Sequence, residues 1–580
     1  MLKQLAGCVR EYKRPTILTL IFIVGEAVIE TIIPFITANL VNRIKAGASI
    51  ESVMEVGLLL IIMAAISLVC GGLAGFTCAK ASTGFAKNLR SDLFHRIQTY
   101  SFENIDKFSS SSLVTRMTTD VTNVQMAFMM LIRIAIRSPL LLIFSTVMAF
   151  VMGGKLAFVF VVVIPILAFG LLAIGKKAMP AFRSVFKKYD RLNESIEENV
   201  RGMRVVKGFS REEYEKQKFN TAADNIRKDF TKAECIVALN TPLMNLCMYI
   251  NMVVVLLVGS KLAITSGGSA LDVGQISGML TYGMQILMSL MMLSMIYVMV
   301  TMSAESAKRI CEVLEEEPSL KEPEHPVMEV KDGSIEFKNV NFKYSARAKK
   351  YALSDIDLSI RSGMTVGIIG GTGSSKSSLV QLIPRLYDVT EGAVLVGGVD
   401  VRSYDIPTLR SAVAMVLQKN VLFSGTIKDN LRWGNETATD EEIMEACRLS
   451  QADEFIQTFP DKYDTYIEQG GSNVSGGQKQ RLCIARALLK KPKILILDDS
   501  TSAVDTKTDA LIRAGFKNYI PDTTKIIIAQ RIASVEDADL IIVMDNGSIS
   551  AAGTHEDLLQ SSDIYREVYE QQTKGGNENE

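Results

Sequence analysis

A series of apolar stretches, each long enough to cross a bilayer as a helix, limits most strongly what this chain can fold into. They occupy residues 16–40, 56–79, 156–175, 235–260 and 273–304, and about 20 residues of helix span the hydrocarbon layer. Another, at 138–153, is short unless its helix extends back through Ile132 past Arg133 and Arg137, whose side chains can then snorkel to the headgroups. We therefore predict six spans in a transmembrane domain at 1–315, the third at 132–153.

The distribution of basic residues predicts how these helices are oriented. Lys and Arg crowd the N-terminus and the second and fourth connections, whereas the alternate connections hold one or two each. Cytoplasmic loops carry the excess of basic residues, so both termini are expected in the cytoplasm of a multi-pass cell-membrane protein. The two basic connections are long, with apolar residues at three-to-four spacing and few Gly or Pro, which predicts that they prolong the membrane helices into the cytoplasm.

Composition limits the class of partner. Lys+Arg and Asp+Glu balance at 63 each, so the net charge gives no indication of a nucleic-acid partner. A content of 48% hydrophobic residues is high for a wholly soluble protein, so a lipid bilayer is the expected surrounding. The eight cysteines have no CxxC or His-paired spacing, which favours reduced thiols over a metal site.

Two patterns within the spans are candidates for the substrate path. Glu26 and Glu30 lie four residues apart on one helix face, where they either contact a cationic substrate or protons, or form a structural pair bonded to a neighbouring helix. In the last span methionines recur every three or four residues, which suits either a cavity for varied apolar molecules or ordinary helix packing. These methionines are Met284, Met288, Met291, Met295, Met299 and Met302.

The second half of the chain contains a nucleotide-binding pattern. After an acidic, proline-bearing linker, predicted at 316–332, short β-rich runs predict a domain at 333–567, followed by a polar tail at 568–580. The run MTVGIIG is typical of a buried strand and passes directly into GGTGSSKSS and an apolar helix, the context of a P-loop. Backbone N–H groups of such a loop bind phosphates, Lys376 reaches the terminal phosphates and Ser377 ligates magnesium. The predicted ATP-binding residues here are Gly370, Gly371, Thr372, Gly373, Ser374, Ser375, Lys376, Ser377 and Ser378.

A second buried strand, KILILDD, ends in Asp498, which is placed to hold magnesium through water. A P-loop and this aspartate indicate only NTP binding, but the run NVSGGQKQR just before the strand, and STSAVD after it, are more specific. With these motifs the chain resembles ATP-binding cassette (ABC) exporters in which one polypeptide carries six spans and one cassette. The resemblance implies a membrane all-α six-helix transmembrane domain with long cytoplasmic helix extensions, fused to an α/β P-loop ATP-binding cassette domain that uses ATP and Mg²⁺.

The resemblance also implies roles for individual residues. Tyr344 is expected to stack on adenine, Gln418 to sense magnesium, and Asp505 to lie in a loop that crosses the dimer interface. Segments near 105–112 and 210–214 resemble the short cytoplasmic helices that transmit cassette motion to the membrane domain. The signature that closes on a nucleotide held by the opposite cassette is formed by Ser475, Gly476, Gly477 and Gln478.

Three positions depart from the family pattern. Ser375 stands where the P-loop normally has a glycine, so a Cβ lies close to the phosphate path. Asp499 replaces the glutamate that activates water, and a retreat of about 1 Å costs about 100-fold in rate. Gln530 replaces a histidine that reaches the γ-phosphate, and an amide cannot become cationic.

All three departures fall on the site that holds this chain's own nucleotide, whereas the signature is intact. The asymmetry predicts a heterodimer, resembling bacterial multidrug-type exporters, in which this chain contributes a slow site and completes the partner's competent site. The expected cargo is an amphipathic or hydrophobic compound. Alternatives are a slow homodimeric exporter, a transporter of lipid, peptide or haem-like cargo in either direction, and an ATP-gated regulator that does not pump.

Overall fold

The computed structural model describes residues 2–266, 271–345, 348–500 and 504–577. The chain forms two compact units. One comprises Met1–Gln98 with Ser109–Glu316 and is helical, and the other comprises Thr99–Phe108 with Glu317–Glu580 and contains the sheets.

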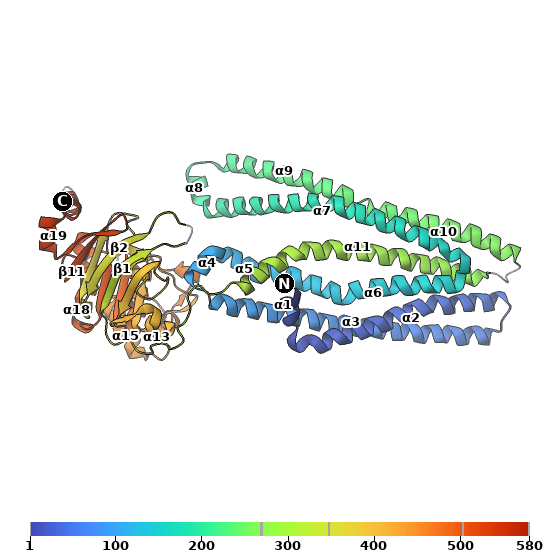
Figure 1. Cartoon of the computed structure of the whole chain (residues 1–580), viewed down its shortest axis with the longest axis horizontal. Helices are drawn as coiled ribbons and strands as arrows, with labels where there is room; N and C mark the ends of the chain where they lie inside the picture. Colours follow the sequence, from blue (N-terminus) through green and yellow to red (C-terminus); the bar gives the residue numbers. More distant parts are fainter. Residues whose placement is uncertain (1, 267–270, 346–347, 501–503, 578–580) are drawn as a thin grey trace. The chain divides into compact units, whose positions relative to one another are not determined.

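Long helices make up the first unit (Figure 1). Gly154, with φ +51, follows the last residue of α6, and α7 then returns in the opposite direction (Figure 1). A capping box between Asp272 and Gln275 begins the last helix. The helices are α1 (Leu2–Gly7), α2 (Lys13–Lys45), α3 (Ile50–Gln98), α5 (Ser110–Thr115), α6 (Val121–Gly153), α7 (Phe158–Arg201), α8 (Met203–Gly208), α9 (Glu212–Val237), α10 (Asn240–Thr265) and α11 (Val273–Glu315).

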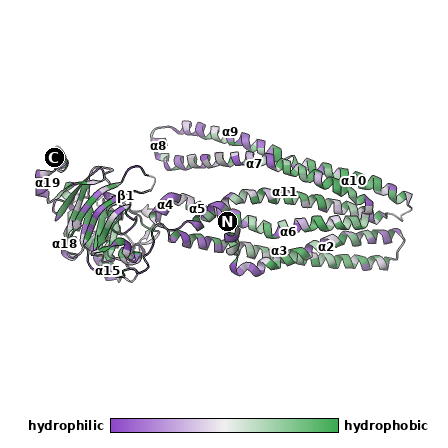
Figure 2. Cartoon of the chain, in the orientation of Figure 1, coloured by the Kyte–Doolittle hydropathy of each residue, from purple (hydrophilic) through white to green (hydrophobic). Residues whose placement is uncertain are grey.

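Among the described residues, five continuous helical stretches are long and apolar enough to span a membrane. One of them, Ser110–Val185, contains both α6 and the apolar part of α7, which correspond to the predicted third and fourth spans. The others are Arg10–Lys45, Ile50–Gln98, Glu212–Thr265 and Val273–Glu315. The long helices are hydrophobic over most of their length and become hydrophilic toward the ends near α8 and α5 (Figure 2). This change is expected where helices extend beyond the lipid.

Several boundaries differ from the sequence-based expectation. The predicted span at 235–260 is interrupted, because α9 ends at Val237 and α10 begins at Asn240. The short helix expected near 210–214 lies earlier, at Met203–Gly208, and the one expected near 105–112 is divided between α4 (Phe102–Phe108) and α5. The predicted polar tail at 568–580 is helical as far as Asn577, in α20 (Asp563–Asn577).

The second unit is built on two main sheets (Figure 1). A six-stranded sheet has the order β12-β11-β3-β10-β9-β6, in which β11, β3, β10, β9 and β6 are parallel, and a four-stranded antiparallel sheet has the order β2-β1-β4-β5. The strands of these sheets are β1 (Ile335–Phe342), β2 (Leu353–Ile360), β3 (Thr365–Gly370), β4 (Glu391–Val396), β5 (Val399–Asp400), β6 (Val413–Val416), β9 (Ile494–Asp498), β10 (Thr524–Ile528), β11 (Leu540–Asp545) and β12 (Ser548–Gly553).

Helices complete the second unit. Because β9 and β10 are buried along their whole length, they lie in the interior of the parallel sheet, as their continuous apolar sequences predict. A short hairpin pairs β7 (Gly425–Thr426) with β8 (Tyr466–Ile467). The helices are α4, α12 (Lys376–Gln381), α13 (Ile406–Ala412), α14 (Ile427–Arg432), α15 (Asp440–Leu449), α16 (Asp453–Ile456), α17 (Gly476–Leu489), α18 (Thr506–Tyr519), α19 (His555–Ser561) and α20.

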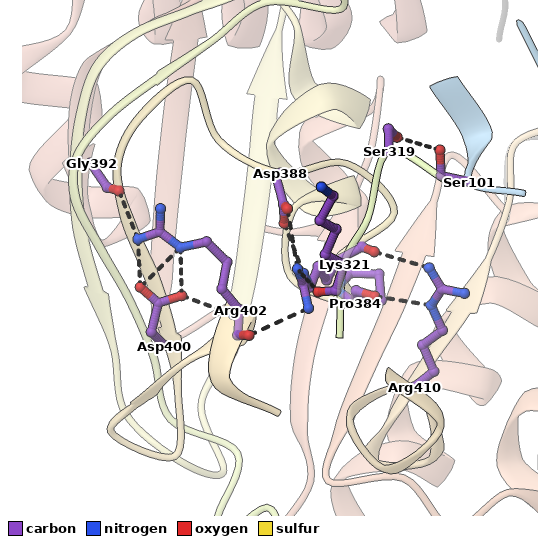
Figure 3. A network of polar contacts seen from close by, with 10 residues as sticks. Ser101, Ser319, Lys321, Pro384, Asp388, Gly392, Asp400, Arg402 and Arg410 are labelled. Atoms are coloured by element: carbon purple, nitrogen blue, oxygen red, sulfur yellow. Dashed lines mark hydrogen bonds and ion pairs between the residues drawn. The ribbon is translucent and has the colours of Figure 1, made fainter. Parts of the chain in front are cut away.

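A buried arginine, Arg385, holds the segment at 317–321, with which the long second part of this unit begins. The Arg385 side chain is 3% exposed and donates to Asp388 and to the backbone carbonyl of Lys321. Ser319 hydrogen-bonds Ser101 just before α4 (Figure 3). Asn104 of α4 also donates to the carbonyl of Glu317 at 3.0 Å. The segment 317–321 is therefore tied to both α4 and the sheet domain within this unit.

Candidate nucleotide site

The candidate nucleotide residues gather at the carboxyl ends of four neighbouring parallel strands. The P-loop follows β3, Gln530 follows β10, Asp498 and Asp499 end β9, and Gln418 follows β6. In an open parallel α/β sheet this edge is where ligands bind. Strand order therefore explains how residues more than a hundred positions apart come to one site.

The P-loop joins β3 to α12 through a left-handed turn. Gly373 has φ +85, and Ser375, directly before α12, has φ +69 and ψ +25. Glycine adopts this region freely, whereas a residue with a Cβ is strained there by roughly 1–2 kcal/mol. Ser375 thus carries strain at the position where the motif normally has glycine.

Lys376 folds back over the loop that precedes it. Its Nζ donates to the carbonyls of Gly370 and Gly371 at 2.8 Å each and lies 3.4 Å from the Ser374 hydroxyl. Burial lowers the pKa of Lys376, and the carboxylates of Asp498 and Asp499 oppose that shift. The ammonium is therefore held over the loop whose backbone N–H groups are available for phosphate.

Ser377 and Asp498 form an oxygen pair beside the loop. The Ser377 hydroxyl donates to Asp498 Oδ1 at 3.0 Å. Burial raises the pKa of Asp498, with the Ser377 hydrogen bond opposing the shift and the neighbouring Asp499 adding to it. Hydroxyl and carboxylate oxygens are the ligands that Mg²⁺ prefers, and Mg²⁺ usually keeps waters and substrate phosphates as its other ligands. These two residues therefore fit a magnesium ion that arrives with a nucleotide.

Asp499 is bonded directly to Gln530. Gln530 Nε2 donates to Asp499 Oδ2 at 2.6 Å, and Gln418 Nε2 lies 3.4 Å from the same oxygen. The backbone of Asp499 has φ +49 and donates to the Ile528 carbonyl at 3.1 Å. The structure thus brings together two of the three departing positions and the magnesium-sensing candidate.

Tyr344 reaches the P-loop helix. Its hydroxyl is 2.7 Å from the Ser378 hydroxyl, and the residue is 42% exposed, as stacking on a base requires. The ring packs against Tyr387 in a T-shaped pair, with ring centroids 5.1 Å apart and an interplanar angle of 89°. Tyr387 was not identified from sequence, and it also donates to Asp106 of α4 at 2.9 Å. The tyrosine pair therefore connects α4 with the predicted adenine position.

The signature residues lie in another part of the unit, at the start of α17, which packs against α14, α15 and β6. Ser475 is the N-cap, its hydroxyl accepts from Gln478 N–H at 3.3 Å, and its own N–H donates to Gln478 Oε1 at 2.8 Å. Ser475 and Gly476 are exposed. An exposed helix N-terminus with a reciprocal capping box presents the donors that suit an anion.

Asp505 caps α18. Its carboxylate accepts from the N–H and hydroxyl of Thr508 at 2.9 and 2.7 Å, and these bonds lower its pKa. Of the run STSAVD, residues 501–503 lie outside the described residues.

The two membrane glutamates are held by an arginine. Arg137 Nη2 of α6 donates to Glu30 at 2.6 and 2.8 Å and lies 3.5 Å from Glu26 Oε1. Arg137 therefore points to α2, where both carboxylates lie within reach of its guanidinium. This arrangement corresponds to the predicted structural pair bonded to a neighbouring helix.

The methionine face of α11 is turned away from its packing partners within the chain. Met284 is 56%, Met288 49% and Met295 57% exposed, and Met299 is partly exposed. The opposite face, with Tyr282 and Ile286, is fully buried. Packing inside this chain therefore does not account for the stripe.

Sequence reasoning missed Gln572 of α20, which hydrogen-bonds the backbone on either side of Arg531. The spacing of Tyr565, Val568, Tyr569 and Gln572 at i, i+3, i+4 and i+7 indicates one helix face, but it does not identify the loop that this face contacts.

Comparison with known proteins agrees with both units. The family model described as the ABC transporter transmembrane region matches residues 16–290, and the model described as ABC transporter matches residues 353–502. The predicted fold class, a helical membrane domain fused to an ATP-binding cassette, is confirmed by these matches.

Relatives of the same length support this result. The chain is 36% identical over 555 residues to an uncharacterized ABC transporter ATP-binding protein, YfiB, of Bacillus subtilis, with 96% of each chain covered. It is 35% identical over 564 residues to an uncharacterized ABC transporter ATP-binding protein of Mycobacterium tuberculosis, again with 96% of each covered. A solved bacterial Atm1-family ABC exporter with ATP bound has the same fold, with a TM-score of 0.85, 23% identity, and 97% and 99% of the two chains covered.

Proposed function

The chain belongs to the ABC transporter family, and on that premise we propose that it is the subunit of a heterodimeric exporter that contributes the slower of two ATP sites. Its cassette provides an ATPase fold coupled to transport, and ATP is the implied substrate. A dimer of cassettes forms two sites, each from one chain's P-loop and the other chain's signature. This chain's P-loop site and its signature therefore serve different sites.

One observation carries the proposal. Asp499 occupies the position of the catalytic base, and its Oδ2 is already engaged at 2.6 Å by Gln530, which occupies the position of the γ-phosphate histidine. A carboxylate that is one methylene short and bonded to an amide is a poorly placed base for water. The same amide contributes no positive charge to the transition state. Both deficits act on one site.

The rest of this site supports binding without fast turnover. The Lys376 ammonium is held over the P-loop, where it can exchange its carbonyl contacts for phosphate oxygens, and Ser377 with Asp498 suits magnesium. Bound magnesium would neutralise phosphate charge during hydrolysis. Ser375 adds a strained Cβ beside the phosphates. ATP held here with little turnover would keep this half of the cassette dimer closed while the other site cycles.

The signature supports a role in the partner's site. Ser475 and Gly476 are exposed at the N-terminus of α17, where helix N–H groups favour an anion. An intact signature has a use only when it completes a competent site on another chain. This feature favours the transporter over an ATP-gated regulator that does not pump.

The exposed methionine face supports an apolar or amphipathic cargo. Met288, Met295 and Met299 offer flexible, polarisable surface that is not used for packing inside the chain. Glu26 and Glu30 share Arg137, so their negative charge is partly neutralised and they are weak candidates for binding a cationic group. We place the subunit in the cell membrane with both termini in the cytoplasm.

The experiment is reconstitution of the chain in lipid with and without a second half-transporter that has the full glutamate and histidine. Little ATPase activity alone and robust activity together support the heterodimer. Robust turnover by the chain alone, abolished by Asp499→Asn, would instead identify a homodimer with an active aspartate.

A further inference from the structure

A polar side chain of α20 holds the loop that carries Gln530. Gln572 Nε2 donates to the Gln530 carbonyl at 2.9 Å, and Gln572 Oε1 accepts from the Ile532 N–H at 2.9 Å. One side-chain amide thus satisfies an acceptor and a donor two residues apart. If the amide were flipped, Nε2 would face the Ile532 N–H and Oε1 would face the Gln530 carbonyl. These two bonds therefore determine the orientation of the Gln572 amide.

We infer that Gln572 is a positioning residue for this chain's own nucleotide site and that α20 acts as a tether on the loop at 530–532. The inference rests on the proposed function, since the loop belongs to the site described there as slow. It extends that function by assigning control of the site to a helix beyond the nucleotide motifs.

The base of α20 is anchored firmly. Tyr565 is fully buried, and its hydroxyl is 2.7 Å from His555 Nδ1 of α19. Val568 and Tyr569 pack against the core of the parallel-sheet domain. Gln572 lies on the same helix face, less than one turn beyond Tyr569, so the packing of Tyr569 fixes the position of the Gln572 side chain. The loop is therefore held by a rigid element rather than by a flexible tail.

The tether continues to the catalytic position. The backbone of Gln530 is bonded to Gln572, and its side chain donates to Asp499 Oδ2 at 2.6 Å. Ile532 is 2% exposed, and its N–H donates to Gln572 Oε1 at the far end of the same loop. Fixing the backbone on both sides of Arg531 keeps the Gln530 amide directed at Asp499. Without Gln572 the loop at 530–532 gains conformations in which the Gln530 amide leaves the Asp499 carboxylate. ATP binding must then order the loop again, and this loss of conformational entropy lowers the affinity for ATP.

The test uses the full-length chain in lipid and three variants. Gln572→Ala removes both bonds, and Gln572→Glu keeps an acceptor for Ile532 N–H but loses the donor to Gln530. Gln571→Ala is the matched control, because Gln571 is the neighbouring exposed glutamine and its side chain donates to Glu567 of its own helix, not to the loop at 530–532. Two quantities are measured: hydrogen exchange at the Ile532 amide, and the dissociation constant of a fluorescent ATP analogue with Mg²⁺.

We expect exchange at Ile532 to accelerate about fivefold to tenfold in Gln572→Ala, since one hydrogen bond contributes on the order of 1 kcal/mol. Gln572→Glu should recover most of that protection, and Gln571→Ala should leave it unchanged. The dissociation constant should rise several-fold in Gln572→Ala and remain unchanged in the control. Unchanged exchange in Gln572→Ala, or accelerated exchange with unchanged nucleotide affinity, would overturn the tether.

These outcomes are independent of the proposed division of labour. Exchange and binding do not require that the site be slow, so a failed result here removes only the role of Gln572. The heterodimer proposal is tested separately by turnover of Asp499→Asn.

Discussion

The carboxylate of Asp499 accepts a 2.6 Å hydrogen bond from the side-chain amide of Gln530, so the two substituted catalytic positions of this cassette are bonded to each other. Residues after β9 and β10 meet because those strands are parallel neighbours. The contact couples the two positions, so the effects of changing them are not expected to be additive.

The first prediction is that Asp499→Glu combined with Gln530→His increases ATP turnover by the isolated chain at least about tenfold, because it restores a base of full reach and a cationic group on the γ-phosphate. Either substitution alone should give a smaller gain, since each restores only one of the two missing groups. Steady-state phosphate release in lipid measures this. No gain from the double variant would mean that other residues limit the site.

The second prediction concerns the strained P-loop. Ser375→Gly should raise the free energy of unfolding by roughly 1 kcal/mol, because it removes a Cβ from a left-handed backbone conformation. Thr372→Gly is the control: Thr372 is in the same loop, outside that conformation, and its replacement should be neutral or destabilising. Thermal unfolding of the purified chain measures both. A destabilised Ser375→Gly would show that the Ser375 side chain stabilises the loop.

The third prediction concerns the membrane ion pair. Arg137→Leu should destabilise the chain by about 2 kcal/mol, a value below that of a fully buried pair because the partners are partly exposed. Adding Glu30→Gln should recover part of the loss, since the unpaired carboxylate is then removed. The exposed pair Arg10–Asp92 is the comparison, and Arg10→Ala should cost about 0.5 kcal/mol or less. Equal losses for Arg137→Leu and Arg10→Ala would contradict a structural role for Arg137.

The fourth prediction concerns cargo. Replacing Met288, Met295 and Met299 by alanine should change which amphipathic compounds stimulate the ATPase of the reconstituted pair, because these side chains provide exposed, adaptable apolar surface. Replacing buried Met279 on the same helix is the control and should lower thermal stability instead. A parallel fall in stability, basal activity and response to every compound would identify the methionine face as packing.

Much of this architecture follows from local sequence. Long apolar runs predicted the membrane helices, and the strand-loop-helix context of GGTGSSKSS predicted the P-loop, because each signal is contained in one continuous segment. Contacts between distant segments were not predictable. Neither the bond from Arg137 to Glu30 nor that from Gln572 to the loop at 530–532 has a local signature, since each depends on which helices pack together. The break between α9 and α10 was missed although Asn240, Thr241 and Pro242 interrupt the apolar run there, a pattern typical of the start of a helix.

The most direct test of the division of labour compares Ser475→Ala with Asp499→Asn in the reconstituted pair, measuring steady-state ATP hydrolysis at saturating ATP. Ser475→Ala should nearly abolish turnover, because it removes a donor that the partner's competent site takes from this chain. Asp499→Asn should have only a modest effect, with Lys376→Ala between the two through weaker ATP binding. If Asp499→Asn is as damaging as Ser475→Ala, Asp499 is a working catalytic base and this chain's own site is not the slow one.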